Sequence, residues 1–376
     1  MSLLRVTHGV NDLLHTEDGQ TFIDLISSTG AVFLGHANEA VNRHVAAQLD
    51  RISCSWTSTM AIQDECKELV GRHLEDRLAL YSLYSSGMEA AEVAMRIAFH
   101  ETKRSEIIGF RNDNHGKSLA TQNLTGVDAD IPRFEGFHQI PFLPDHGEDE
   151  ILEHVAEVVT SSRAAAIFIE PMQGRGGGYA AGADFYAEVQ RLCRDHGVLI
   201  ICDEIFTGFY RTGACFRYPA LGLRPDIVLI GKAIGNGFPA AGVVLDRRLQ
   251  YHPKDFRLNS TFSDNPVACA AVVGTVCEME RIDIQAKVAR IERSFAALDG
   301  GATVRRRHHG AACFLELDSP RSAAVVQEHL QRNHVLALQR DAILGFWPPA
   351  TITDEHLELV VEVTNDALER DSGTAP

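Results

Sequence analysis

The sequence predicts an α/β protein, with a mostly parallel sheet in a large domain and a smaller α+β domain. Three continuously apolar runs, at 164–170, 198–204 and 226–232, predict strands that are buried on both faces. A helical pattern separates the first two runs, and strands that alternate with helices are typical of this class. From residue 266 onward the order of elements changes, which indicates the second, smaller unit.

Two helices of the large domain have recognisable ends. In the segment 183–197, apolar residues recur at helical spacing, and Gly197 predicts the C-terminal end. In the segment 85–99, Ser86 and Glu89 have the spacing of a capping box ahead of a helix. A helix that begins there presents free backbone N–H groups, which can bind an anion. A capped helix without a ligand explains the same pattern, so both interpretations stay open.

The two ends of the chain predict shorter elements. Residues 12–25 have the pattern of a β-hairpin, and 266–280 predicts a largely buried helix. Beyond these we expect an amphipathic stretch at 284–298, strands at 312–318 and 335–339, and a helix near 322–332. The basic run 305–309 predicts a solvated turn. We divide the chain into an N-terminal segment of the small domain (1–45), the large domain (46–265) and the C-terminal small domain (266–376).

Composition excludes several classes of function. The formal net charge of −16 argues against a nucleic-acid or anionic-membrane partner, and no apolar run is long enough to span a membrane. The N-terminal stretch does not predict a secretion signal. The eight cysteines form no C-x-x-C pair and predict buried, reduced thiols of a cytoplasmic protein. No histidine spacing typical of a metal site occurs, so we predict no metal.

The ends of the three predicted strands carry charged residues. Glu170 follows the first strand, Asp203 and Glu204 follow the second, and Lys232 follows the third. Because ligands of such sheets bind outside the carboxyl ends of the strands, these residues mark the predicted site. A phosphate-binding P-loop at Lys232 is excluded, because Asp226 and Ala233 occupy positions where that motif needs glycine and a hydroxyl residue.

Six motifs give the chain a resemblance to a known family. They are SSGMEAAE (85–92), NHGKS (114–118), EPMQGRGGG (170–178), ICDEIFTGFYRTG (201–213), LIGKAIGNGFPAAG (229–242) and STFSDNP (260–266). In order and spacing this set resembles the class III aminotransferases, the ornithine, acetylornithine and 4-aminobutyrate transaminase group. The resemblance implies the fold type I of enzymes that depend on pyridoxal 5′-phosphate (PLP), with PLP bound in the domain 46–265.

The resemblance implies two catalytic residues. Asp203 pairs with the pyridine nitrogen of PLP and keeps the ring cationic, so that the ring can accept electrons from the substrate carbon. Lys232 forms a Schiff base with PLP and, once an amine displaces it, carries a proton between the substrate carbon and the cofactor. Glu204 braces the end of the strand.

Further residues are implied to bind the cofactor. The backbone of Gly87 and Met88 binds the phosphate, together with Thr261 of a neighbouring subunit, so a homodimer with shared active sites is expected. Ile205 contacts one ring face and Asn114 the other. The whole implied set is Ser86, Gly87, Met88, Asn114, His115, Glu170, Asp203, Ile205, Lys232 and Thr261.

The chain departs from the family pattern at five positions. Met88 replaces a threonine, Asn114 replaces the aromatic residue that stacks on the ring, and Phe206 replaces a glutamine. Arg175 occupies the position of a glutamate that masks a substrate-binding arginine, and Gly345 occupies the position of that arginine. Arg175 either binds an anionic substrate group or pairs with a local acid, and the sequence does not decide between these.

These observations predict a cytoplasmic PLP-dependent aminotransferase. It would move an amino group from an amine or amino acid to a ketone or aldehyde by a ping-pong mechanism. Two alternatives remain: an aminomutase of the glutamate-1-semialdehyde type, and a PLP-binding protein without turnover.

Overall fold

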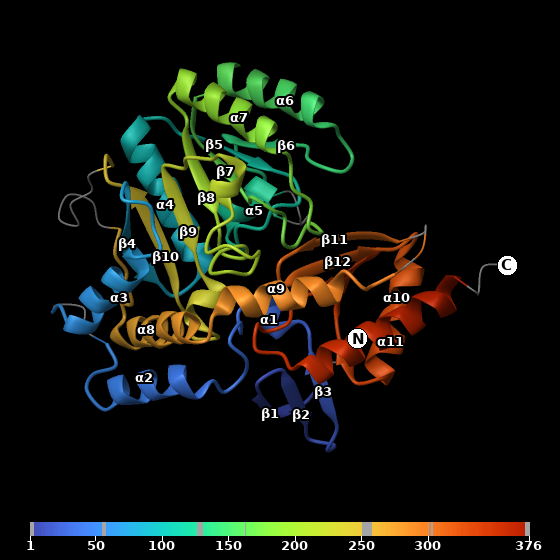
Figure 1. Cartoon of the computed structure of the whole chain (residues 1–376). Helices are drawn as coiled ribbons and strands as arrows, with labels where there is room; N and C mark the ends of the chain where they lie inside the picture. Colours follow the sequence, from blue (N-terminus) through green and yellow to red (C-terminus); the bar gives the residue numbers. More distant parts are fainter. Residues whose placement is uncertain are drawn as a thin grey trace.

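A seven-stranded sheet forms the centre of the larger part of the protein (Figure 1). The computed structural model describes residues 4–54, 58–125, 131–161, 163–249, 258–299, 301 and 304–372. The sheet has the order β4-β10-β9-β8-β7-β5-β6, and the four pairings from β9 to β6 are parallel. Its strands are β4 (Leu78–Tyr84), β5 (Glu106–Phe110), β6 (Phe137–Ile140), β7 (Ala164–Ile169), β8 (Leu199–Asp203), β9 (Ile227–Ile230) and β10 (Ala241–Asp246). Because only β10 runs antiparallel to its neighbours, the predicted mostly parallel sheet is confirmed.

Helices cover both faces of this sheet, which explains its continuously apolar strands. Successive residues of a strand point to opposite faces. Phe168 and Ile201 pack in the same apolar cluster as α4 (Gly87–Thr102). Ile167 and Ile200 pack in the cluster that contains α6 (Glu148–Ser161) and α7 (Ala183–His196). The predicted strands at 164–170, 198–204 and 226–232 are therefore confirmed as β7, β8 and β9.

The helix predicted at 183–197 is confirmed as α7. Gly197 ends it with a left-handed backbone (φ 65°), and its N–H donates to carbonyl groups of the last turn. This conformation is easy for glycine, so the local sequence alone fixes the end of the helix.

The N-terminal hairpin shares a sheet with a strand from near the other end of the chain. β1 (Val6–Val10), β2 (Leu13–Thr16) and β3 (Thr21–Asp24) form an antiparallel ladder, which confirms the hairpin predicted at 12–25. β13 (Val335–Leu336) pairs with β3 in parallel. The N-terminal segment is thus held by the C-terminal part of the chain.

The second small sheet corrects two predictions. It has the order β11-β12-β15-β14 and is antiparallel throughout. The basic run 305–309, predicted to be a solvated turn, forms its edge strand β11, where Arg307 bonds to Glu316 of β12 and to the Gly177 carbonyl, and His309 lies next to the Gly178 carbonyl. The single strand expected at 335–339 is divided between β13 and β14, which belong to different sheets. The strands are β11 (Arg305–His309), β12 (Ala312–Glu316), β14 (Leu338–Arg340) and β15 (Ile343–Phe346).

The remaining helices surround these sheets. The predicted buried helix at 266–280 is confirmed as α8 (Pro266–Arg281), which packs against α2 (Glu39–Leu49) and α3 (Ala61–Gly71). Since α2 spans the boundary expected at residue 45, the division into 1–45, 46–265 and 266–376 stays a prediction. The other helices and turns are α1 (Ser27–Gly30, with left-handed Ser28 and Thr29), α5 (Leu119–Thr125), α9 (Ile284–Phe295), α10 (Pro320–Arg332), α11 (Asp354–Ser372), η1 (Tyr218–Leu221) and η2 (Lys232–Gly235).

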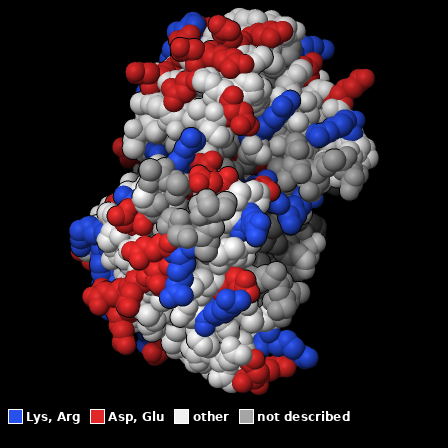
Figure 2. Space-filling model, turned by 90° about the vertical axis from the view of Figure 1, so that its right-hand side faces the viewer, with Lys and Arg blue, Asp and Glu red and all other residues white. Residues whose placement is uncertain are grey.

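The acidic excess of the sequence lies partly on the outer helices. Figure 2 shows acidic side chains gathered at the top of one face, at the height of α6 and α7 in Figure 1. The first turn of α6 carries three acids, Glu148, Asp149 and Glu150. Among the residues that the structure describes, no helix has the length and apolar character needed to cross a membrane.

A fully buried arginine joins three distant segments. Arg211 donates hydrogen bonds to the carbonyl oxygens of Gly30 (3.3 Å), Ala311 (3.2 Å) and Pro348 (2.7 Å). Its guanidinium carbon lies 4.2 Å from the centre of the Phe33 ring. Burial lowers the pKa of Arg211 to about 9. One side chain thus links stretches of the chain near residues 30, 211, 311 and 348.

Replacing Arg211 with methionine should lower the free energy of unfolding by about 3 kcal/mol, because three buried carbonyl groups lose their donor. Urea unfolding followed by circular dichroism measures the change. The exposed Arg224→Met serves as the matched control and should change stability by less than about 0.5 kcal/mol. A loss below about 1 kcal/mol in the Arg211 variant would contradict the structural role.

Candidate active site

The charged residues predicted at the strand ends lie at one edge of the central sheet. β7, β8 and β9 are parallel neighbours, so Glu170, Asp203 and Lys232 emerge from the same edge. Glu170 and Asp203 are buried, at 5% and 2% exposure, and Lys232 is part-buried. Charges in such a setting need partners.

Asp203 is paired with a histidine from another loop. Its Oδ2 lies 2.7 Å from Nδ1 of His115, and its Oδ1 accepts from the Ile205 N–H at 3.0 Å. Nε2 of His115 lies 3.5 Å from Asp113. Burial lowers the pKa of His115, but the hydrogen bonds and charges of Asp113 and Asp203 outweigh it and raise this pKa to about 10. His115 is therefore a cation between two buried carboxylates at neutral pH.

The other acid and the lysine affect each other. Burial, reinforced by the negative charges of Asp113 and Asp203, raises the pKa of Glu170 well above its usual range. Burial lowers the pKa of Lys232, and the positive charge of Arg211 lowers it further by a smaller amount. The negative charges of Glu170 and Asp203 oppose this shift. A lysine with a lowered pKa is neutral part of the time, as a nucleophile or proton carrier must be.

Glu204 has a separate, structural environment. Its carboxylate is fully buried and accepts hydrogen bonds from the backbone N–H groups of Arg217 and Tyr218 and from the Thr207 hydroxyl. These contacts fix the chain that leaves β8, as expected of a residue that braces the strand end.

Lys232 separates two adjoining cavities. It begins the short turn η2 with a left-handed backbone (φ 45°), and its Nζ lies 4.7 Å from the centre of the Phe206 ring. A cavity of about 270 Å³ that includes Gly87 and Ile205, here called the inner cavity, and a cavity of about 380 Å³ that includes Arg175, here called the outer cavity, share Lys232 and Asn114. The amine therefore stands where two bound molecules would meet.

The inner cavity holds most of the predicted cofactor-binding residues. Ser86 caps α4 by accepting from the Glu89 N–H at 3.2 Å, and the Glu89 carboxylate accepts from the Ser85 N–H rather than from that of Ser86. The N–H groups of Gly87 and Met88 have no acceptor within the helix, because they belong to its first turn. The predicted residues that line this cavity are Ser86, Gly87, Met88, Asn114, His115, Ile205 and Lys232.

Two predicted residues line neither cavity, and a third, Glu170, lines only the outer one. Asp203 is behind the inner cavity and reaches it through its contact with His115. Thr261 is exposed and lines neither cavity of its own chain; its carbonyl accepts from the thiol of Cys54 at 3.7 Å. Its expected role toward a neighbouring subunit stays a prediction.

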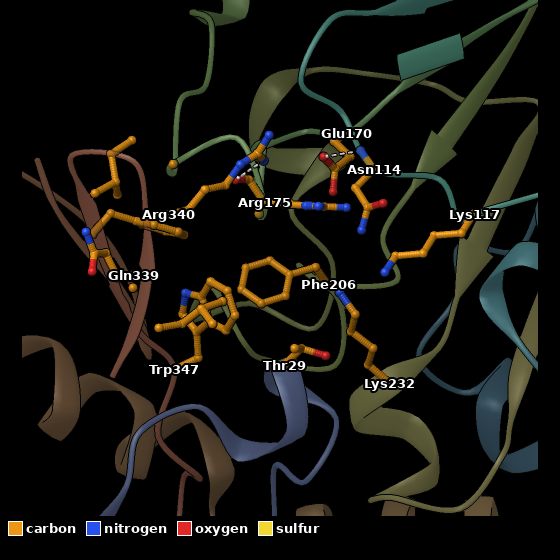
Figure 3. A pocket seen from close by; sticks show the side chains of 16 residues that line it. Thr29, Asn114, Lys117, Glu170, Arg175, Phe206, Lys232, Gln339, Arg340 and Trp347 are labelled. Atoms are coloured by element: carbon orange, nitrogen blue, oxygen red, sulfur yellow. Dashed lines mark hydrogen bonds between the residues drawn. The ribbon is translucent and has the colours of Figure 1, made fainter. Parts of the chain in front are cut away.

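The outer cavity contains Glu170 and Arg175. In Figure 3 the side chains of Arg175 and Lys117 extend toward Asn114 from opposite sides. No carboxylate of the described residues lies within 4 Å of the Arg175 guanidinium, which disfavours the local ion pair that the sequence left open. The carbonyl oxygen of Arg175 accepts a hydrogen bond from Arg340 at 2.8 Å.

Sequence reasoning missed several residues of the outer cavity. Lys117 belongs to the motif NHGKS (114–118), and its place three residues after Asn114 was the feature that could have identified it as a cavity residue. Arg340 and Trp347 carried no such signal, since the C-terminal sheet brings them to the cavity. The Trp347 ring packs edge-on against Phe206, with 5.2 Å between the ring centres. A Cβ atom on Gly345 would lie 2.9 Å from the Trp347 ring, so the indole fills the space beside this glycine.

The sequence comparison decides the family. The model of the family "Aminotransferase class-III" matches residues 1–368. The chain belongs to the class III aminotransferases. Their cofactor is PLP, and this protein is accordingly a PLP-dependent enzyme of amino-group transfer, neither an aminomutase nor a protein without turnover.

Curated relatives cover three quarters or more of the chain. The [LysW]-aminoadipate semialdehyde/glutamate semialdehyde transaminase of Sulfolobus acidocaldarius is 29% identical over 97% of this chain and 95% of its own. The acetylornithine aminotransferase of Bacillus subtilis is 30% identical over 94% and 91%. The 2-aminoadipate transaminase of Pseudomonas putida is 32% identical over 77% and 75%.

Solved structures share the fold. A transaminase from the marine bacterium Virgibacillus superposes with a TM-score of 0.91 at 22% identity, over 99% of this chain and 94% of that one. An amine transaminase from an uncultivated Pseudomonas species, described in its PLP-bound form, gives 0.88 at 23% identity, over 98% and 95%. The predicted fold type I is thereby confirmed.

The inner cavity suits PLP. A phosphate can meet the free N–H groups at the start of α4, and the absence of a side chain at Gly87 leaves room there, since a Cβ would lie 2.6 Å from the end of the Ile205 side chain. Lys232 supplies an amine at the junction with the outer cavity. Among the described residues, no three or more His, Cys, Asp or Glu side chains are placed to hold a metal ion.

The Glu204 environment predicts a pH effect on stability. Burial raises the pKa of Glu204 to about 7, against 4.5 in the unfolded chain, although its hydrogen bonds oppose the shift. The folded protein therefore binds this proton more tightly than the unfolded chain does. The stability that this binding contributes is fully present below pH 4.5 and is lost as the pH rises through 7. Glu204→Gln cannot ionise, so it should gain up to about 3 kcal/mol relative to the native protein between pH 4.5 and 8.

Urea unfolding of both proteins at several pH values measures this difference. The exposed Glu153→Gln on α6 controls for the removal of one surface carboxylate. A stability difference between native protein and Glu204→Gln that stays constant with pH would contradict the assignment.

Proposed function

We propose that this aminotransferase transfers an amino group from an amine or amino acid to a ketone or aldehyde, by a ping-pong mechanism in which at least one substrate is anionic. The observation that carries the proposal is the position of Lys232 between the two cavities. The inner cavity would hold PLP and the outer cavity the substrates in turn.

The residues of the inner cavity would hold the cofactor. Lys232 would hold PLP covalently through Nζ, and Asp203 would bind the pyridine nitrogen, supported by His115. Ile205 and Asn114 would lie on the two faces of the ring, and Glu170 close to it. The N–H groups of Gly87 and Met88, on the helix capped by Ser86, would bind the phosphate.

PLP supplies a cationic ring that withdraws electrons from the substrate carbon. The chain's own part is the movement of the proton. Once the amine substrate has displaced it, the neutral Nζ of Lys232 would take the proton from the substrate carbon that bears the amino group and would pass it to the cofactor carbon that carries the nitrogen, on the same side of the ring. The lowered pKa of Lys232 supports this role, because a permanently charged amine cannot accept a proton.

Arg175 would bind the anionic group of a substrate. It lines the outer cavity together with Lys117 and Arg340, against the single acid Glu170 in that lining. Guanidinium groups bind carboxylates by paired hydrogen bonds. The relatives named above act on amino acids and their semialdehydes, which supports a carboxylate-bearing substrate.

A homodimer would complete the site. An apolar groove of about 220 Å³ adjoins the inner cavity and shares Ser85, Phe238 and Pro239 with it. Phe262, which lines this groove next to Thr261, is 55% exposed and suits a covering partner. A monomer in analytical ultracentrifugation at assay concentrations would contradict this arrangement. The eight free thiols, five of them buried, support a cytoplasmic location.

Lys232→Ala should abolish the proton transfer and the covalent hold on PLP. We expect turnover to fall by at least about 10³-fold in a screen of amino donors. The visible spectrum of the purified protein, followed while each donor is added, reports both cofactor binding and turnover. Lys287→Ala on α9 is the control, and a variant of Lys232 that keeps turnover would refute the role.

Arg175→Ala should raise KM for the dicarboxylate acceptor 2-oxoglutarate about tenfold, because one charged hydrogen-bond pair is lost. The kinetic constants for the uncharged acceptor butanal should stay within about twofold. Arg175→Lys keeps the charge but not the paired geometry, so its KM for 2-oxoglutarate should lie between those of the native protein and Arg175→Ala. An unchanged KM for 2-oxoglutarate would end the hypothesis.

A further inference from the structure

The segment Gln173–Tyr179, here called the glycine-rich loop, carries Arg175 into the outer cavity. The loop closes on itself, since Gln173 N–H donates to the Tyr179 carbonyl and Gly178 N–H donates to the Gln173 carbonyl, both at 2.8 Å. Gly177 and Gly178 have left-handed backbones, with φ of 102° and 79°. This turn leaves the carbonyl groups of 175, 177 and 178 pointing outward, where other donors can reach them.

The C-terminal sheet supplies those donors. Arg307 Nε on β11 donates to the Gly177 carbonyl at 2.7 Å. His309 Nε2 on the same strand lies 3.2 Å from the Gly178 carbonyl, and Arg340 Nη1 on β14 donates to the Arg175 carbonyl at 2.8 Å. The loop is thus held at three carbonyl groups by the opposite edges of one small sheet.

The sheet also contacts the loop backbone directly. A Cβ atom on Gly177 would lie 2.5 Å from Ile343, and one on Gly178 would lie 2.3 Å from Phe314. Both glycines have left-handed backbones that L side chains rarely adopt, and at Gly178 an added Cβ would overlap the Phe314 ring. The loop backbone therefore lies directly against the sheet.

Arg307 is itself rigidly held. Its Nη1 lies 2.7 Å from Glu316, its guanidinium carbon lies 3.9 Å from the centre of the Tyr179 ring, and the Tyr179 hydroxyl donates to Glu316 at 2.8 Å. The side chain lines neither cavity around Lys232. Arg307 therefore acts on the loop and not on a bound molecule.

The loop in turn contacts the reacting centre. A Cβ on Gly174 would lie 2.5 Å from the Phe206 ring, and that ring lies 4.7 Å from Lys232 Nζ. A displacement of the loop would move Arg175 and release Phe206.

We propose that Arg307 is a positioning residue for anion recognition: by holding the Gly177 carbonyl it fixes where the Arg175 guanidinium meets a carboxylate. Arg340 and His309 hold the loop at two further carbonyl groups, those of Arg175 and Gly178. The inference rests on the proposed role of Arg175 and extends it, because selectivity for anionic substrates then depends on a residue outside the cavity and in the other sheet.

Fluorescence of Trp347 gives a test that does not depend on turnover. The chain has two tryptophans, and Trp56→Phe leaves Trp347, in the wall of the outer cavity, as the only one. The holoenzyme is titrated with glutarate, a dicarboxylate, and with glutaramide, its uncharged analogue. Arg307→Met should weaken glutarate binding about tenfold and leave glutaramide binding within about twofold. Arg307→Lys should restore part of the affinity.

Three controls make the outcomes distinct. Arg305→Met removes an exposed arginine from the same strand and should leave both affinities unchanged. Glu316→Gln removes the charged partner of Arg307 but keeps the arginine, and it should weaken glutarate binding about threefold. This variant tests the proposal even if Arg307→Met does not fold. Arg175→Ala tests the proposed function separately, since an unchanged glutarate affinity in that variant refutes the role of Arg175 itself.

The proposal is overturned if Arg175→Ala weakens glutarate binding while Arg307→Met does not. It is equally overturned if Arg307→Met weakens glutarate and glutaramide to the same extent, because Arg307 then has a merely structural role.

Discussion

Buried carboxylates at one edge of the central sheet dominate the physical chemistry of this enzyme. Asp113, Glu170 and Asp203 are 1%, 5% and 2% exposed, and ionised groups at such sites are very costly unless they are paired. The adjacent cations are His115 and Lys232. Burial raises the pKa values of Asp113 and Glu170, and the pKa of His115 rises to about 10 in response to its two acidic neighbours. A cationic ring bound in the inner cavity would add positive charge to an edge that is rich in negative charge.

The parallel sheet converts this electrostatic cluster into an oriented site. Neighbouring parallel strands end at the same edge, so residues far apart in the chain emerge side by side, and Lys232 lies at the boundary between two cavities. The amine then faces the inner cavity on one side and the outer cavity on the other. Burial lowers the pKa of Lys232, and burial likewise raises the pKa values of Asp113 and Glu170.

Three of the positions at which we expect a departure from the family pattern, 175, 206 and 345, lie around one aromatic wall. Phe206 packs against Trp347, and both lie next to glycines whose Cβ atoms would collide with the rings: Gly30 and Gly174 at Phe206, and Gly345 at Trp347. An arginine at 345 has no space while the indole is there. Gly345 and the aromatic wall are therefore linked by packing, and Gly174 brings the same wall beside the loop that carries Arg175.

The sequence by itself determined the features that depend on neighbouring residues. Apolar runs gave β7, β8 and β9, helical spacing with Gly197 gave α7, and Ser86 with Glu89 located the start of α4. Strand ends and ordered motifs then indicated Glu170, Asp203 and Lys232. Only the tertiary structure decided the partners of these groups. His115 and Asp203 are 88 residues apart in the chain, and Arg340 meets the Arg175 carbonyl across 165. The basic run 305–309 resembled a turn because its stabilising partners, the loop carbonyls and Glu316, lie outside any local window. Periodicity and capping act within a few residues, whereas the pairing of buried charges depends on which strand ends and loops the fold brings together.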